Sequence, residues 1–320
     1  MAIFEKKEEF IPRQKQKVLN ASVGRKFVLI LLTGSVVLSF LFWGWGSLRE
    51  KWPGSVSQTL IKEGGDEGFA SSQTKSFFTA EDQLNDLVKN LSGKYGVYVY
   101  NLSRKTGYGI ESQETFLAAS LIKLPVILTL YQEVETGRVS LETKYTLKQA
   151  DKQIGAGSMQ AKSAGTIYTY RQMAELMGKQ SDNTAFNVIR KVLGDQKIQE
   201  TINQLGMTKT SLVKNETTPV DIGLFFRKLY GGSVVTREHR EEILDFLTNT
   251  IYEDRIPAGV PKDVRVAHKI GNEVGVFSDA GIVFAEKPFV LVIMSKDALE
   301  KEAKTVLPEI TKAVWEFETK

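Results

Sequence analysis

The sequence of 320 residues contains no cysteine and only two histidines. Without cysteine the protein can form no disulfide, no thiolate nucleophile and no sulfur-ligated metal site. His239 and His268 are far apart in the sequence and lack the HExxH context, so the sequence predicts no zinc site. The GxSxG motif is also absent, which argues against a hydrolase of the Ser-His-Asp type.

Excess charge is also scarce, and it is confined to one end of the chain. The net charge is +4. Residues 1–26 carry seven basic and three acidic side chains, so this basic tail accounts for all of it. The remaining segment has 35 basic and 35 acidic residues. Such a balance gives no electrostatic reason to expect nucleic-acid binding.

One long segment, residues 27–46, contains no charged side chain. A helix of this length measures about 30 Å, enough to cross a bilayer. The basic tail before it predicts a cytoplasmic N-terminus and an extracytoplasmic remainder. A cleaved signal peptide is the alternative, but its charged region would be unusually long and no A-x-A site follows. We therefore expect a membrane anchor at residues 27–46.

The part of the chain after the anchor divides into a stalk and one domain. Residues 47–76 are rich in Ser, Gly, Gln and Lys without a sustained period, which predicts a flexible stalk. Residues 77–320 have the patterns of a globular domain. Strand patterns occupy 95–112 and 263–295, and helical patterns dominate the intervening residues.

This order of elements predicts an α+β domain. We expect a five-stranded antiparallel sheet, built from both ends of the domain and flanked by helices. A mostly helical subdomain is expected from about residue 140 to 250, and a terminal helix at about 298–317. Another helix is expected after Thr79, which would be its N-cap.

Ser120 and Lys123 are two polar residues within the apolar run ASLIKLPV. On a helix, positions i and i+3 share a face, so the hydroxyl and the amine can touch. Two further SxxK pairs lie in the stalk and in a short polar segment: Ser72/Lys75 and Ser211/Lys214. Only Ser120 opens a long apolar helix, whose dipole would favour an oxyanion. Taken alone, Ser120 is more simply explained as an N-cap.

Two other short motifs follow in the chain. Ser181-Asp182-Asn183 can be a helix start, because all three residue types cap helices well. Lys269, in the segment His268-Lys269-Ile270-Gly271, ends a predicted strand, where a buried lysine is rare unless it binds something. A literal Lys-Thr-Gly also occurs at 105–107, but it precedes Ser120 and falls in a predicted hairpin turn.

The ordered series of Ser-x-x-Lys, Ser-Asp-Asn and Lys-x-Gly resembles the class A serine β-lactamases and their penicillin-binding relatives. The resemblance covers roughly residues 80–318. Smaller similarities are the segments GAGSMQ, TTP and SDAGIVF, at residues 155–160, 217–219 and 278–284. The resemblance implies the β-lactamase/transpeptidase-like fold and a serine acyl-transfer mechanism, with no metal or organic cofactor.

The resemblance also implies roles for the catalytic residues. Ser120 would attack a β-lactam or peptide carbonyl and form an acyl-enzyme. Lys123 would act as its base, with a pKa lowered by burial and by the positive charge of Lys269. Ser181 would relay the proton to the leaving nitrogen.

Four residues would bind the substrate by the same resemblance. Asn183 would hold the substrate amide, and Lys269 with Gly271, on their strand, would face the substrate carboxylate. The backbone N–H groups of Ser120 and Asn272 would form the oxyanion hole.

The sequence departs from the family pattern at two places. Ile270 stands where the family usually has Thr or Ser, which removes a hydroxyl expected to bind the substrate carboxylate. The loop that supplies the deacylating glutamate of class A enzymes looks cut out between Asn183 and Pro219. Glu216 is a candidate substitute, although an acid at a turn or helix start is the simpler interpretation.

Three functions remain open from the sequence. A β-lactamase would hydrolyse β-lactams and must release its acyl group quickly, which the missing glutamate opposes. A penicillin-binding D,D-peptidase or transpeptidase would act on peptidoglycan peptides, and the anchor fits this function. A non-catalytic cell-wall-binding domain would keep only the fold, but the intact motif serines and lysines argue against it.

Overall fold

The computed structural model describes residues 79–320. The predicted basic tail, membrane anchor and stalk at 1–26, 27–46 and 47–76 lie outside the described residues. Within 79–320, no helix is both long and apolar enough to cross a membrane.

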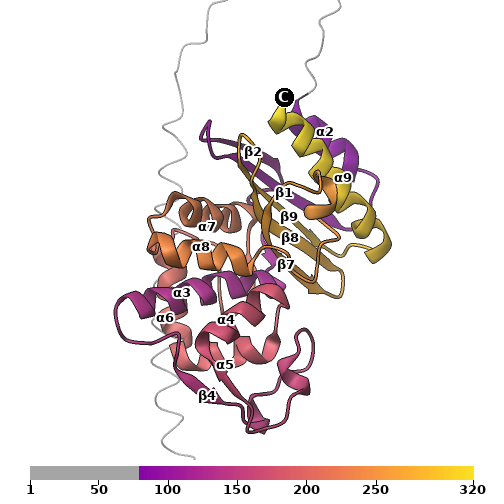
Figure 1. The fold of residues 1–320 in the computed structure, drawn as a ribbon. Helices are drawn as coiled ribbons and strands as arrows, with labels where there is room; N and C mark the ends of the chain where they lie inside the picture. Colours follow the sequence, from indigo (N-terminus) through magenta and orange to yellow (C-terminus); the bar gives the residue numbers. More distant parts are fainter. Residues whose placement is uncertain (1–78) are drawn as a thin grey trace, which may run out of the picture. The chain divides into compact units, whose positions relative to one another are not determined.

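The centre of the domain is a five-stranded antiparallel sheet with the strand order β2-β1-β9-β8-β7 (Figure 1). Its strands are β1 (Lys94–Asn101), β2 (Thr106–Ile110), β7 (Val266–Glu273), β8 (Val276–Val283) and β9 (Phe289–Lys296). The first and last strands of the chain pair directly, from Lys94 opposite Lys296 to Asn101 opposite Phe289. The predicted α+β fold, with one sheet built from both ends of the domain, is confirmed.

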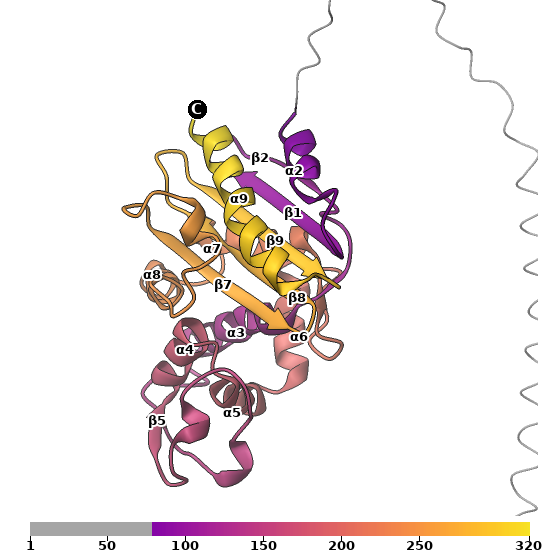
Figure 2. The same ribbon diagram turned by 90° about the vertical axis from the view of Figure 1, so that its right-hand side faces the viewer.

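Helices cover both faces of this sheet. Helices α2 (Ala80–Val88) and α9 (Glu300–Thr319) lie on one face, and α7 (Pro219–Gly231) lies on the other (Figure 2). The central strand β9 accordingly contributes alternate residues to two apolar cores. Val290, Val292 and Met294 belong to the core on the α7 side, whereas Phe289, Leu291 and Ile293 belong to the core under α9. The predicted cap of α2 is also confirmed, because Thr79 and Asp82 form a capping box.

The predicted helical subdomain is present. It contains α4 (Tyr170–Lys179), α5 (Asn183–Leu193), α6 (Asp195–Gln204) and α8 (Arg237–Phe246), and α3 (Lys123–Glu135) runs into it. Two short strand pairs were not predicted: β4 (Lys144–Thr146) with β5 (Ile167–Thr169), and β3 (Phe116–Leu117) with β6 (Glu216–Thr217). Strands of two or three residues are too short to produce a recognisable period of two.

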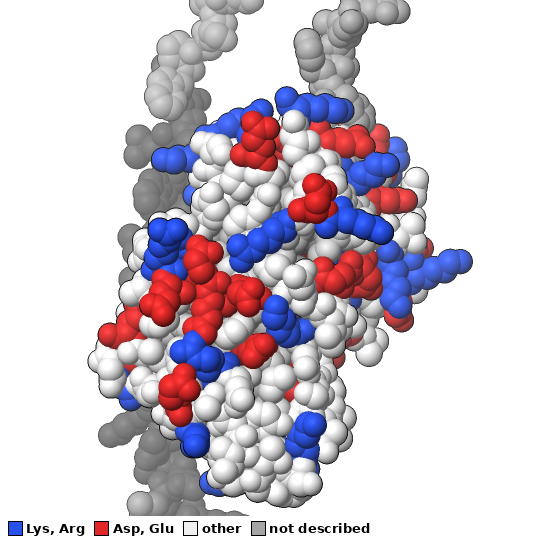
Figure 3. All heavy atoms as spheres, viewed as in Figure 1, with Lys and Arg blue, Asp and Glu red and all other residues white. Residues whose placement is uncertain are grey.

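Basic and acidic side chains are interspersed over the face of the domain shown in Figure 3. This distribution agrees with the charge balance of the sequence beyond the basic tail.

Candidate active site

Ser120 lies at the junction between the sheet and the helical subdomain. It belongs to a short 3-10 helix, η1 (Ala119–Ile122), and α3 begins only at Lys123. Ser120 is therefore not the N-cap of α3, and the first turn of α3 has no side-chain cap. The preceding residue, Ala119, has a left-handed backbone with φ of 47°. Such strain costs about 1–3 kcal/mol and is found where surrounding structure fixes a functional side chain.

The predicted contact between Ser120 and Lys123 is confirmed. The Lys123 Nζ atom lies 3.0 Å from Ser120 Oγ. The same nitrogen lies 2.5 Å from the carbonyl oxygen of Ser181, 3.2 Å from Ser181 Oγ and 2.7 Å from Asn183 Oδ1. The Asn183 amide orientation is consistent, because its nitrogen donates to Ile154 O.

These contacts fit an ammonium group and also a neutral amine, and the neutral form is the one that can act as a base. The carbonyl of Ser181 and the amide oxygen of Asn183 can only accept hydrogen bonds, so they take two N–H donors of Lys123. A neutral amine has two N–H groups and one lone pair. Its lone pair is then free to accept the proton of the Ser120 hydroxyl. The arrangement can therefore activate Ser120 as a nucleophile.

Burial makes this neutral form accessible. Lys123 is 2% exposed, and burial lowers its pKa to about 8, against the opposing pull of the Asp182 and Glu273 carboxylates. The repulsion between Lys123 and Lys269 lowers mainly the pKa of Lys269. Burial, followed by the positive charge of Lys123, lowers the pKa of Lys269 well below its usual range.

The buried side chain of Asp182 holds the Ser-Asp-Asn segment in place. Asp182 is completely buried, caps α5 through the N–H of Ala185 at 2.8 Å and accepts the N–H of Met159 at 2.8 Å. Ser181 has a left-handed φ of 56°, and both its carbonyl and its hydroxyl contact Lys123. A Cβ on Gly157 would lie 2.2 Å from an Asp182 carboxylate oxygen, so this glycine permits the close approach of the GAGSMQ segment.

Strand β7 brings Lys269 to the other side of Ser120. Alternate residues of a strand share a face, so Lys269, Gly271 and Glu273 point the same way. A Cβ on Gly271 would lie 2.9 Å from Ala118 O and 3.4 Å from Leu121 Cγ. This face of β7 therefore packs directly against η1, and only glycine fits at the point of contact.

The backbone of β7 also exposes a donor at this place. Strand β7 is an edge strand of the sheet, and the N–H of His268 points away from β8 and donates to Leu247 O. Antiparallel ladders alternate the direction of successive N–H groups, and the pairing with β8 is continuous to Glu273. The N–H of Asn272 therefore also points outward from the edge. Its side chain is held by Arg255, whose guanidinium donates to Asn272 Oδ1 at 2.6 Å.

A cavity of about 310 Å³ opens onto Ser120 and Lys123. Asn183 lines it, whereas Ser181 and Lys269 are 2% and 1% exposed and lie behind its wall. The candidate deacylation base Glu216 is not one of its lining residues; the neighbouring Asn215, with a left-handed φ of 55°, lines it instead. Asn215, and not Glu216, therefore forms part of the wall of the cavity that opens onto Ser120.

Other residues of the site escaped the sequence reasoning. Asn215, Glu273 and Arg255 belong to no recognisable motif, and only Glu273 carried a signal, its place two residues beyond Gly271 on the same strand face. Within residues 79–320, no cluster of three His, Cys, Asp or Glu side chains could hold a metal ion.

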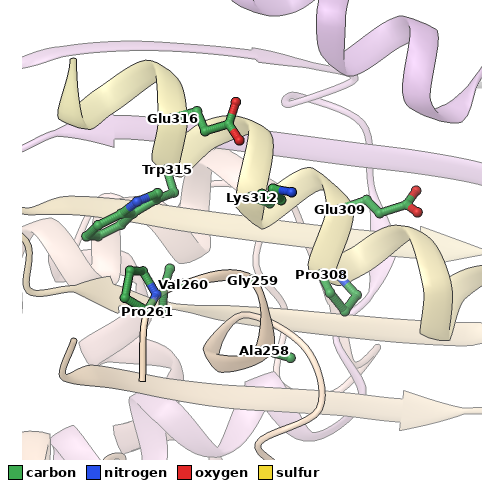
Figure 4. A pocket seen from close by; sticks show the side chains of 9 residues that line it. All are labelled: Ala258, Gly259, Val260, Pro261, Pro308, Glu309, Lys312, Trp315 and Glu316. Carbon is green, nitrogen blue, oxygen red and sulfur yellow. The ribbon is translucent and has the colours of Figure 1, made fainter. Parts of the chain in front are cut away.

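A second cavity, of about 510 Å³, lies between η4 (Pro257–Gly259) and α9 (Figure 4). Trp315 and Pro261 form part of its apolar lining, and Glu309 and Lys312 belong to its rim. No serine or threonine lines it. Among the cavities found in the described residues, only the first is lined by both Ser120 and Lys123.

This fold and site define a β-lactamase-like serine hydrolase of the β-lactamase and penicillin-binding superfamily. The chain belongs to the beta-lactamase enzyme family, whose model matches residues 79–317. Beta-lactamase 3 of Bacillus cereus is 28% identical over 251 residues, which cover 72% of this chain and 78% of that protein.

Solved structures agree with this assignment. The structure of PBP-A is 27% identical with a TM-score of 0.72, and the match covers 75% of this chain and 96% of PBP-A. A mutant of PBP-A, solved as an acyl-enzyme complex with penicillin G, is 26% identical with a TM-score of 0.71; this match covers 75% and 97% of the two chains.

Proposed function

We propose that this protein forms an acyl-enzyme on Ser120 with β-lactams and releases the acyl group slowly. The observation that carries the proposal is the hydrogen-bond pattern of Lys123, which leaves the amine lone pair for the Ser120 hydroxyl. Lys123 takes the proton as Ser120 Oγ attacks the β-lactam carbonyl carbon. The resulting oxyanion is stabilised by the N–H groups of Ser120 and Asn272.

The tetrahedral intermediate then collapses and the carbon–nitrogen bond of the lactam breaks. Ser181, whose Oγ lies 3.2 Å from Lys123 Nζ, relays the proton to the leaving nitrogen. Asn183 binds the substrate amide. Lys269, in its protonated form, attracts the substrate carboxylate through the cavity wall behind which it is buried. Ile270 contributes no hydroxyl to that carboxylate.

Slow release follows from the segment that would supply the deacylation base by the resemblance, although the Glu273 carboxylate also lines the cavity. The segment between α6 and α7 contributes only Asn215 to the cavity, and an amide cannot remove a proton from water. This favours a second candidate function, a D,D-peptidase or transpeptidase that acts on peptidoglycan peptides. Likeness to PBP-A supports the same alternative.

We further propose that residues 27–46 anchor the protein in a bacterial cell membrane, with the N-terminus in the cytoplasm and the enzyme domain outside. The uncharged run and the basic tail before it carry this proposal. The location would place the domain beside the cell wall.

Covalent labelling tests the acylation step. A fluorescent penicillin should label the full-length wild-type protein in a form that survives denaturation, and Ser120→Ala should abolish the label. Ser211→Ala is the matched control, because Ser211 also belongs to an SxxK pair but lies outside the cavity. Equal labelling of the Ser120→Ala variant, or no labelling of the wild type, would contradict the proposal.

A further inference from the structure

Strand β7 places a carboxylate at the far end of the candidate active site. Lys269, Gly271 and Glu273 share the strand face that packs against η1. Glu273 is the last paired residue of β7, opposite Val276, and it is exposed. It lines the same cavity as Ser120 and Lys123. The carboxylate therefore belongs to the space that a substrate of Ser120 must enter.

Glu273 supplies the only carboxylate among the residues that line this cavity. The other charged lining residues are Lys123 and Arg190. Arg190 is paired with Asp195 through two hydrogen bonds of 2.6 and 2.7 Å, and Lys123 is engaged with Ser120, Ser181 and Asn183. Within residues 79–320, the Glu273 carboxylate has neither a hydrogen bond nor a salt bridge. An incoming cation would thus meet an unpaired anion.

Glu273 also acts electrostatically on the centre of the site. Its negative charge is one of the two that raise the pKa of Lys123 against the effect of burial. Charges that interact across the cavity are close enough to influence a bound substrate as well. The Glu273 side chain is therefore an electrostatic part of the cleft and not merely a solvated hairpin residue.

We propose that Glu273 is a specificity-determining residue that binds a cationic group, an ammonium or guanidinium, on the acyl side of the substrate. The inference rests on the proposed acylation of Ser120 and names the substrate class. Four residues of extended strand separate Lys269 from Glu273, which corresponds to about 13 Å. The unpaired Glu273 carboxylate thus gives this end of the cleft an anionic site for an amine. A peptide with a free amino side chain matches it.

Two penicillins test this directly with the full-length protein. Ampicillin and benzylpenicillin share the ring system and the phenyl group, and ampicillin adds one ammonium group on the acyl side chain. The measured quantity is the ratio of their second-order acylation rate constants. Comparing this ratio among variants cancels the intrinsic reactivities of the two compounds.

We expect the ampicillin-to-benzylpenicillin ratio to fall about fivefold in Glu273→Gln, the size expected for one accessible ion pair. In Glu273→Lys the ampicillin-to-benzylpenicillin ratio should fall further. This variant should also acylate faster with carbenicillin, which carries a carboxylate at the same position. High salt should reduce the wild-type preference. Glu286→Gln is the matched control, because Glu286 is an exposed glutamate in the β8–β9 turn, outside the cavity, and should leave the ratio unchanged.

Other results have distinct meanings. An unchanged ratio in Glu273→Gln would overturn the inference and leave the acylation of Ser120 intact. An unchanged ratio with a much longer acyl-enzyme lifetime would also overturn it, because Glu273 would then serve the attacking water. Failure of both penicillins to acylate the wild type would remove the proposed function, and the assigned role of Glu273 with it.

Discussion

Lys123 can serve as a base because its N–H groups are taken by neighbouring oxygens while its nitrogen lies beside the Ser120 hydroxyl. Two carbonyl oxygens take its N–H groups, and burial lowers its pKa to about 8. A protonated Lys123 would have no lone pair for the Ser120 proton. Acylation therefore requires the fraction of the protein in which this amine is neutral.

This requirement predicts a pH dependence. The rate constant for acylation should rise with pH and level off above about pH 8, with about a tenfold change per unit well below that value. Glu273→Gln should shift the curve to lower pH, because the Glu273 carboxylate raises the pKa of Lys123. Stopped-flow acylation by a chromogenic cephalosporin from pH 6 to 10 measures both effects. A rate that falls between pH 7 and 9 would contradict the role of Lys123.

Residues inside motifs could be predicted from the sequence, and residues outside them could not. Ser120, Lys123, Ser181 and Asn183 are brought together as expected. The choice between Asn215 and Glu216 could not be predicted, because it depends on a left-handed backbone at a non-glycine residue. Sequence patterns rarely reveal such a conformation.

At the level of elements, the junction of η1 with β7 positions the nucleophile. Helix α3 was expected to begin at Ser120, but a 3-10 turn precedes it and α3 begins at Lys123. The turn allows Ser120 to face the edge of β7, and Gly271 allows the two segments to touch. Short 3-10 segments at helix ends have no periodicity that distinguishes them in a sequence from the helix that follows.

The proposed slow release of the acyl group depends on the segment between α6 and α7. Glu216 is its only acidic residue, and its backbone pairs with Leu117 of β3 and with Ser211. These pairings fix the segment on the strand that leads to the nucleophile. The shortness of this segment was visible in the sequence, but which side chain it directs into the cavity was not.

At the level of the whole molecule, the sheet combines both ends of the domain and supports the helical subdomain on one face. This arrangement could be predicted because strand patterns occupy both ends of the domain and helical patterns occupy the residues between them. Strand β9 is apolar and buried on both faces, so its sequence identified it independently of any motif.

The proposed anchor makes a prediction about topology. Protease added to intact cells should degrade the domain that contains Ser120 and spare the N-terminal tail, because the positive charges before residue 27 favour the cytoplasmic side. Epitope tags at the two ends, followed by immunoblotting, measure this. A mature protein that starts near residue 47 would contradict the anchor and establish cleavage of a signal peptide.

The most direct test of the central claim is the intact mass of the full-length protein, followed over time after mixing with benzylpenicillin. We expect an adduct of one penicillin mass on Ser120 that forms faster than it decays. Lacking a general base in the deacylation step costs about 10²–10⁴ in rate. Glu216→Gln should change the lifetime of this adduct only slightly, because Glu216 lies outside the cavity. Rapid turnover of many equivalents of penicillin, lost in Glu216→Gln, would contradict the account.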